Sequence, residues 1–258
     1  MNNSEVIPDT IFIIPYRDRE SDKKKFIEYM TDYLDEYDGI YKFYFSHQCD
    51  KRPFNRGATK NIGFLAMKKM YPNHYKNITF IFHNVDTLPK TKGSIPYKTT
   101  HGVVSHYYGA TFALGGMFAI KGSDFEKTNG FPNFWGWGLE DNLIQDRCLR
   151  VGLQIDRSIF FKMRDFTNIY RSTHDGVIRT LSKRDSVVYK YESPDSMNDI
   201  KNLTFNINNE MINIQSFQVT MNDEDQDYFK QDVSRNTRVT IPRGYFRRNW
   251  SLNYMMRK

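Results

Sequence analysis

Short apolar runs alternate with amphipathic runs in the first 86 residues, and this alternation restricts the possible folds more than any other feature. β-branched and aromatic residues fill the runs 10–17, 40–47 and 77–86, which is typical of buried strands. The runs between them, 22–37 and 55–70, have apolar residues at helical spacing. Such alternation predicts βαβ units and a mainly parallel sheet flanked by helices.

After Pro89 the pattern is looser, but it still predicts both strands and helices. In chain order we expect an edge strand at 103–108, a strand at 117–120, a short helix opened by a Ser123–Glu126 capping box, a helix at 141–151, a strand at 153–161, and a hairpin over 202–220 that turns at Asn208–Asn209. The simplest organisation is one α/β domain over residues 1–220. Residues 221–258 form a basic C-terminal extension that packs on this domain or trails from it.

The composition permits a large core and restricts the environment of the chain. Of the 258 residues, 39% are hydrophobic, yet no apolar run approaches the ~20 residues of a membrane helix. Glu5, Pro8 and Asp9 interrupt the region where a signal peptide would be apolar. Cys49 and Cys148 are far apart in sequence and form no metal-ligand pair. We therefore expect no membrane span, a reducing compartment and a cytoplasmic location, with a viral or bacterial origin plausible.

The net charge of +7 has two interpretations, because much of the excess lies in the last 24 residues. A basic tail can bind nucleic acid or an anionic surface. It can also be a solvated segment, or part of a face that tolerates a phosphorylated ligand. No nucleic-acid recognition motif is present, which favours the second interpretation.

Charged residues follow three of the predicted strands, at the edge where parallel sheets bind ligands. Arg17, Asp18 and Arg19 follow the first strand, Arg56 follows the second, and Asp86 ends the third. Arginines suit phosphate oxygens, and a carboxylate beside phosphates suits Mn²⁺ or Mg²⁺. The pattern indicates a metal-bound nucleotide diphosphate. Surface arginines and an aspartate that only forms a turn would give the same sequence pattern.

The stretch GFPNFWGWGLEDN, residues 130–142, combines three glycines, two tryptophans and adjacent carboxylates. Glu140 and Asp141 lie where a loop is predicted to become a helix, whose N-terminus stabilises the ionised form. One of them can serve as a base for a hydroxyl, or both can simply cap the helix. Gly136 and Gly138 predict a mobile lid, whereas the tryptophans fit either a core or a sugar-stacking surface.

The order of these motifs resembles the β-1,4-galactosyltransferase family, glycosyltransferase family 7. The matching segments between Ile11 and Val219 are IIPYRDR, FNRGATKNIGF, FHNVDTLP, GGMFAIKGSDFEKTNGFPNFWGWGLED and a later His-Asp pair. HDGVIRTLSKRD is most similar to the branch that adds galactose to xylose. The resemblance implies a GT-A fold with a Rossmann-like sheet and a C-terminal β extension, bound Mn²⁺ or Mg²⁺, and inversion at the anomeric carbon.

Roles for individual residues also follow from the resemblance. It implies that the UDP-sugar is held by Pro15, Arg17, Arg19, Phe54, Arg56 and Gly116, and the metal by Asp86 and His174. Trp137 covers the sugar, and Glu140 binds the acceptor. Asp141 is the general base. The implied donor is UDP-galactose or UDP-GalNAc, and the implied acceptor is a glycan or glycoprotein.

Three positions depart from the family pattern. Asn84 stands where the family commonly has an aspartate, and Arg171 or Ser172 stands where it has a further metal ligand. Ala113 replaces a tyrosine, which would leave room for an N-acetyl group on the donor. The first two departures support an alternative, a carbohydrate- or nucleotide-sugar-binding protein with weakened catalysis. A nucleic-acid-binding protein that uses the basic tail is a second alternative, whereas retention of both Glu140 and Asp141 favours an enzyme.

Overall fold

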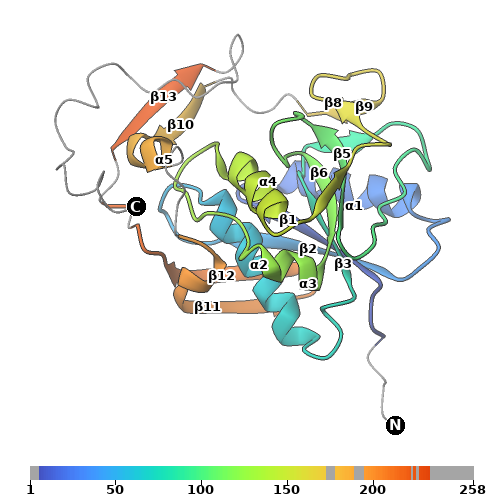
Figure 1. Ribbon diagram of the computed structural model, residues 1–258, viewed down its shortest axis with the longest axis horizontal. Coiled ribbons are helices and arrows are strands. Elements are labelled where there is room, and N and C mark those ends of the chain that lie inside the picture. The colour runs from blue at the N-terminus through green and yellow to red at the C-terminus, as the bar shows by residue number, and fades with distance from the viewer. Residues whose placement is uncertain (1–5, 173–177, 189–194, 222, 225–226, 233–258) are drawn as a thin grey trace.

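The computed structural model has a nine-stranded mixed sheet at its centre (Figure 1). It describes residues 6–172, 178–188, 195–221, 223–224 and 227–232. The sheet order is β11-β12-β2-β1-β3-β6-β5-β7, with β8 beside β5. Its strands are β1 (Thr10–Tyr16), β2 (Tyr41–Gln48), β3 (Thr79–His83), β5 (Val103–Gly109), β6 (Met117–Lys121), β7 (Gln154–Asp156), β8 (Phe161–Lys162), β11 (Lys201–Asn208) and β12 (Met211–Gln218).

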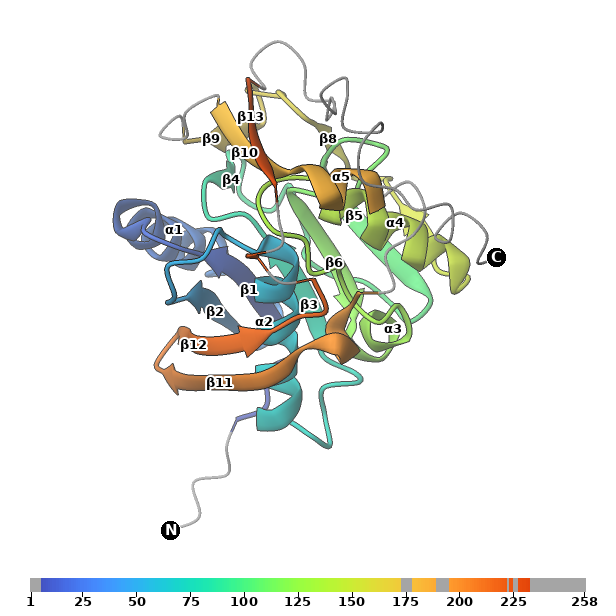
Figure 2. The same cartoon turned by 90° about the vertical axis from the view of Figure 1, so that its left-hand side faces the viewer.

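Helices cover both faces of this sheet (Figure 2). They are α1 (Glu20–Tyr33), α2 (Arg56–Met70), α3 (Gly122–Lys127) and α4 (Glu140–Arg150), whereas α5 (Lys183–Val188) lies beside a smaller sheet outside the main one. Side chains of β1 alternate between the faces, as strand geometry requires. Phe12 and Ile14 join a cluster with α1, whereas Ile11 and Ile13 join a cluster with α2, α3 and α4. All four β1 side chains are fully buried, which accounts for the continuous apolar run of this strand.

The connections around β1 create the crevice that the sequence predicts. β2 and β3 both pair parallel with β1, one on each side. The chain therefore leaves β1 in one direction through α1 and crosses back over it through α2. At such a point the loops that follow the strands diverge and leave a space at their carboxyl ends. The predicted mainly parallel α/β sheet is confirmed.

The C-terminal hairpin extends the same sheet. β12 pairs parallel with β2, and Ile212, Ile214 and Phe217 are buried in the core cluster that includes α2. Two small sheets lie outside the main one: β4 (Thr87–Pro89) with β9 (Ile169–Arg171), and β10 (Ile178–Ser182) with β13 (Tyr228–Asp232). The boundary between residues 220 and 221 stays a prediction.

Four local predictions need correction. Ser123 and Glu126 form no capping box, because Ser123 Oγ pairs with His101 while Glu126 accepts from Lys68 and Tyr75. Strand β5 is interior rather than an edge, since β7 and β8 pair with it.

The predicted strand at 153–161 is divided into β7 and β8, and Ser158 between them donates to Asp156. The hairpin turns at Asn209–Glu210, one residue later than predicted, with Asn209 in the left-handed region at φ 50°.

The described part of the chain contains no helix that is long and apolar enough to cross a membrane. Cys49 is exposed and Cys148 is buried, and both are free thiols. The cytoplasmic location stays a prediction.

Candidate active site

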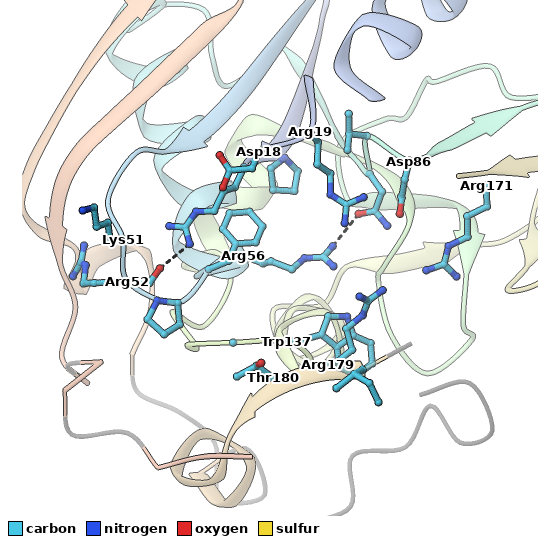
Figure 3. A pocket seen from close by; sticks show the side chains of 18 residues that line it. Asp18, Arg19, Lys51, Arg52, Arg56, Asp86, Trp137, Arg171, Arg179 and Thr180 are labelled. Carbon is cyan, nitrogen blue, oxygen red and sulfur yellow. Dashed lines mark hydrogen bonds between the residues drawn. The ribbon is translucent and has the colours of Figure 1, made fainter. Parts of the chain in front are cut away.

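A cavity of about 630 Å³ lies at the carboxyl ends of β1, β2 and β3 (Figure 3). Loops after the three strands supply one wall, and residues 136–137, β9 and β10 supply the other. Seven residues predicted from the sequence to bind the donor line it: Pro15, Arg17, Arg19, Phe54, Arg56, Asp86 and Trp137. The fold therefore brings together segments that are more than 100 residues apart.

Arginine side chains surround Asp86 within this cavity. Arg19, Arg56, Arg171 and Arg179 point toward the space in front of the Asp86 carboxylate (Figure 3). Burial lowers the pKa of Arg179, and the positive charges of Arg171, Arg56 and Arg19 lower it further. Mutual repulsion of this kind is relieved by a bound polyanion, so the cavity suits a diphosphate.

Arg17 lines the cavity, but its guanidinium group forms hydrogen bonds within the protein. Its N–H groups donate to the backbone carbonyls of Gln48, Asp50 and Arg52 at 3.3, 3.0 and 2.6 Å. The Arg17 guanidinium also lies 5.4 Å from the centre of the Phe54 ring. Arg17 thus fixes the loop between β2 and α2, and with it the position of Phe54 on the cavity wall.

Arg56 connects the cavity to the acidic pair behind it. Its Nη2 donates to Asn84 Oδ1 at 2.9 Å, and its Nε lies 3.3 Å from Glu140 Oε1. Burial lowers the pKa of Arg56, but Glu140, Asp141 and Asp86 outweigh this effect and raise it. At position 84 an amide oxygen therefore serves as an acceptor for Arg56. Asn84 has a structural role here that does not require a metal.

Glu140 and Asp141 occupy the first turn of α4, and their surroundings differ. The Glu140 side chain is 4% exposed, and burial together with the charge of Asp141 raises its pKa despite Arg56 and Lys60. The Asp141 side chain is 22% exposed, and its Oδ1 lies 2.7 Å from Lys60 Nζ. Asp141 is therefore the more accessible carboxylate of the pair.

Backbone hydrogen bonds hold the tryptophan loop, residues 134–138, against its neighbours. Gly136 N donates to Phe54 O at 3.2 Å, and Trp137 N donates to Thr180 O at 2.8 Å. Gly136 has φ 84°, and a Cβ there would lie 2.7 Å from Thr180 O. This glycine is required by the conformation itself, and the lid movement stays a prediction. Trp137 lines the cavity, whereas Trp135 is core, 1% exposed and stacked on Phe217.

The Gly115–Gly116 turn joins the acidic pair to the strand-end loops. Leu114 N donates to Asp141 O at 2.8 Å, and Asn84 N donates to Gly116 O at 3.1 Å. Gly116, predicted as a donor-binding residue, is not among the residues that line the cavity. A Cβ on Gly115 would lie 2.7 Å from Asp141 Oδ2. Close approach to the carboxylate thus requires glycine at 115.

Metal binding has partial support among the described residues. Asp86 offers a carboxylate inside a cavity suited to phosphates, which is the oxygen environment that Mn²⁺ and Mg²⁺ prefer. No group of three or more His, Cys, Asp or Glu side chains that could hold a metal occurs in the described part of the chain. His174, the other predicted ligand, lies outside the described residues. Of the two predicted metal ligands, the described residues thus place Asp86 in the cavity.

Several basic residues at the site were not predicted as functional: Lys51 and Arg52, which line the cavity beside Phe54, together with Lys60, Arg171 and Arg179. Lys60 follows Arg56 by one helical turn, so the i, i+4 spacing was the available signal. Arg171 and Arg179 belong to β9 and β10, which have no clear periodicity in the sequence. The position of Arg171 and Arg179 depends on which strands pair around the cavity, and amino-acid composition does not predict strand pairing.

Family models and individual relatives both show that the chain is similar to galactosyltransferases. The model for the N-terminal region of glycosyl transferase group 7 matches residues 3–98, and the model for the N-terminal domain of galactosyltransferase matches residues 98–175. Beta-1,4-galactosyltransferase 4 of Cricetulus griseus is 34% identical over 151 residues, which cover 55% of this chain and 42% of that protein. Beta-1,4-galactosyltransferase 5 of Mus musculus is 27% identical over 209 residues, or 76% of this chain and 51% of that protein.

Solved structures show the same architecture. The catalytic domain of Drosophila beta-1,4-galactosyltransferase 7, in complex with xylobiose, superimposes with a TM-score of 0.60 at 19% identity, covering 80% of this chain and 93% of that one. A mutant of the Drosophila enzyme in complex with manganese, UDP-Gal and xylobiose gives a TM-score of 0.58 at 18% identity, with the same coverage.

The central sheet and its helical layers define a GT-A type glycosyltransferase fold. The two family models together span residues 3–175, and the chain belongs to glycosyltransferase family 7. It spans about half the length of the curated relatives that it matches.

Proposed function

We propose that this chain is a metal-dependent galactosyltransferase that moves galactose from UDP-galactose to a hydroxyl of a sugar acceptor. The observation that carries the proposal is the cavity in which Arg19, Arg56, Arg171 and Arg179 surround Asp86, next to the Glu140–Asp141 pair. Relatives of the same family are beta-1,4-galactosyltransferases, and one solved relative was captured with manganese, UDP-Gal and xylobiose.

In the donor site, the arginines and the metal would both stabilise the negative charge of the leaving diphosphate. Negative charge builds up on the diphosphate as it leaves the sugar, and cations stabilise that charge. Asp86 and His174 would hold Mn²⁺, which supplies additional positive charge at the leaving group. Trp137, on the opposite wall, would cover the sugar and exclude water that could otherwise hydrolyse the donor.

The transfer would proceed with inversion, and Asp141 would act as the base. The acceptor oxygen bonds to the anomeric carbon while the bond from that carbon to the phosphate oxygen breaks. UDP leaves with the electron pair, and the hydroxyl proton passes to Asp141. Two features support Asp141 over Glu140: the Asp141 side chain is more exposed, and burial raises the pKa of Glu140, which disfavours the ionised form of Glu140. Glu140 would instead bind an acceptor hydroxyl.

The test of donor and metal is UDP release from a panel of UDP-sugars, with and without Mn²⁺, in the presence of mono- and disaccharide acceptors. We expect release that depends on Mn²⁺, on an acceptor and on UDP-galactose. UDP binding without turnover for any donor would instead favour the alternative of a nucleotide-sugar-binding protein. Turnover that ignores chelation of the metal would contradict the metal-dependent mechanism.

We also propose that the donor site tolerates an N-acetyl group at the sugar 2-position, so that UDP-GalNAc competes with UDP-galactose. The support is the small side chain of Ala113, two residues before the Gly115–Gly116 turn that approaches Asp141. Ala113→Tyr should reduce turnover of UDP-GalNAc and leave that of UDP-galactose nearly intact. The idea fails if the wild type uses only UDP-galactose and the substitution changes nothing.

A further inference from the structure

The cluster formed by Lys60, Arg56, Glu140 and Asp141 contains a buried cation with no assigned role. Lys60 lies on α2, one turn after Arg56, and its side chain is 3% exposed. Its ammonium group lies 2.7 Å from Asp141 Oδ1 and 4.0 Å from Glu140 Oε1. A buried ammonium group requires a strong local reason, because its transfer out of water is costly unless it is paired.

The contacts of Lys60 determine where its charge is directed. The face of the Phe131 ring lies 4.3 Å from Nζ, so the ammonium group is held between an aromatic ring and the Asp141 carboxylate. Arg56 is directed to the other acid, with Nε 3.3 Å from Glu140. The four charges balance, and each acid has its own cation. The closer of the two Lys60 contacts is with Asp141.

Both oxygens of the Asp141 carboxylate have close neighbours. Oδ1 is paired with Lys60, and Oδ2 lies against Gly115, where a Cβ would approach to 2.7 Å. The backbone oxygen of the same residue accepts from Leu114 N at 2.8 Å. Lys60 on α2 and the Gly115 turn therefore restrict where this side chain can lie. A base held in this way is oriented before the acceptor arrives.

We propose that Lys60 is a positioning residue for the transfer reaction: it pairs with the Asp141 carboxylate and orients it from behind, and it touches neither donor nor acceptor. This inference rests on the proposed function. Adjacent carboxylates in a buried setting disfavour each other's charge, so removal of one of the two cations leaves the pair undercompensated. The effect should appear in the chemical step rather than in donor binding.

The experiment compares Lys60→Met with Lys68→Met in steady-state transfer, alongside UDP affinity by calorimetry and Tm. Lys68 lies on the same helix and pairs with Glu126, away from the acidic pair, so its substitution controls for the loss of a more exposed ion pair on α2. We expect Lys60→Met to lower kcat by about 10- to 100-fold, with the donor KM and the UDP affinity unchanged. Lys68→Met should retain kcat.

Two further variants separate positioning from a merely structural role. Lys60→Arg keeps the charge and should retain most of the wild-type kcat. If the Met variant does not fold, the kcat of Lys60→Arg is compared with that of the wild type instead. Since Lys60 acts through Asp141, adding Lys60→Met to Asp141→Asn should lower kcat no further. An unchanged kcat in Lys60→Met beside an active wild type would overturn the inference, as would equal losses in the Met and Arg variants. The wild-type rate tests the proposed function separately.

Discussion

At the residue scale, most basic side chains around the acidic pair and the β2–α2 loop have a specific partner within the protein. Arg17 is committed to backbone carbonyls, Arg56 to Asn84 and Glu140, and Lys60 to Asp141. A sequence can indicate which charged residues follow a strand, but it cannot show which of them pair with the protein and which face a ligand. Arg17 illustrates this, because it lies in the predicted place while its N–H groups stabilise a loop.

A steric requirement beside the acidic pair concerns Gly115. Its φ is outside the left-handed region, so alanine is compatible with the backbone. The added Cβ would, however, lie 2.7 Å from Asp141 Oδ2 and force that carboxylate to move. We expect Gly115→Ala to lower kcat roughly 10- to 100-fold, because small misplacements of catalytic groups are costly, with little change in Tm. Full activity in steady-state assays would contradict the described packing of Asp141.

At the element scale, β10 and α5 support the tryptophan loop from beneath. Trp135 N donates to Asp185 Oδ2 at 2.7 Å, and Trp137 N donates to Thr180 O on β10. These elements carry little periodicity, so the sequence did not predict them, whereas β1, α1, β2, α2 and β3 were all predicted. Strong periodicity arises where an element is buried along one whole face. Elements that form the rim of a cavity lack that constraint.

The buried Asp185 gives this support a pH dependence. Burial raises its pKa to about 7, with a further contribution from Asp195, whose own pKa burial raises to about 6. A carboxyl group whose pKa is higher in the folded protein contributes stability below its unfolded pKa of about 3.9, and that contribution is lost as the pH rises through 7. The folded protein should thus lose stability on the order of 1–4 kcal/mol from this group between pH 4 and 8.

Asp185→Asn removes this titration and retains an oxygen that can accept from Trp135 N. The difference in Tm between the variant and the wild type should therefore move in favour of the variant as the pH rises from 4.5 to 8.5. Thermal unfolding over this range measures it, and the comparison cancels the contributions of other groups. Parallel curves for the two proteins would show that Asp185 ionises without cost.

At the scale of the whole molecule, one sheet joins the N-terminal strand–helix units to the C-terminal hairpin. β12 pairs with β2, and β11 forms the edge of the sheet beyond it, so the C-terminal hairpin belongs to the main sheet. The sequence predicted the hairpin but not its partner, because pairing between distant strands leaves no local signal. The mainly parallel α/β sheet was predictable, since consecutive strand–helix units restrict the topology to few arrangements, whereas the GT-A class was predicted from the family resemblance.

Truncation tests the contribution of this hairpin. A chain ending at residue 200 lacks Ile212, Ile214 and Phe217, all buried against the core. Each such side chain contributes about 1.5–3 kcal/mol, and together they approach the ~5–15 kcal/mol that stabilises a typical domain. We expect residues 1–200 to lose cooperative unfolding and residues 1–232 to retain it, as measured by calorimetry. A cooperative transition for 1–200 would show that the hairpin is dispensable.

The central claim is that Asp141 deprotonates the acceptor in a sugar-transfer reaction, and kcat for Asp141→Asn tests it most directly. The variant keeps the size and position of the side chain but removes the base, so transfer to a saturating acceptor should fall about 10²- to 10⁴-fold. Donor KM and Mn²⁺ dependence should stay close to those of the wild type. A kcat for Asp141→Asn within a factor of about three of the wild type, far short of a loss of that size, would contradict the account.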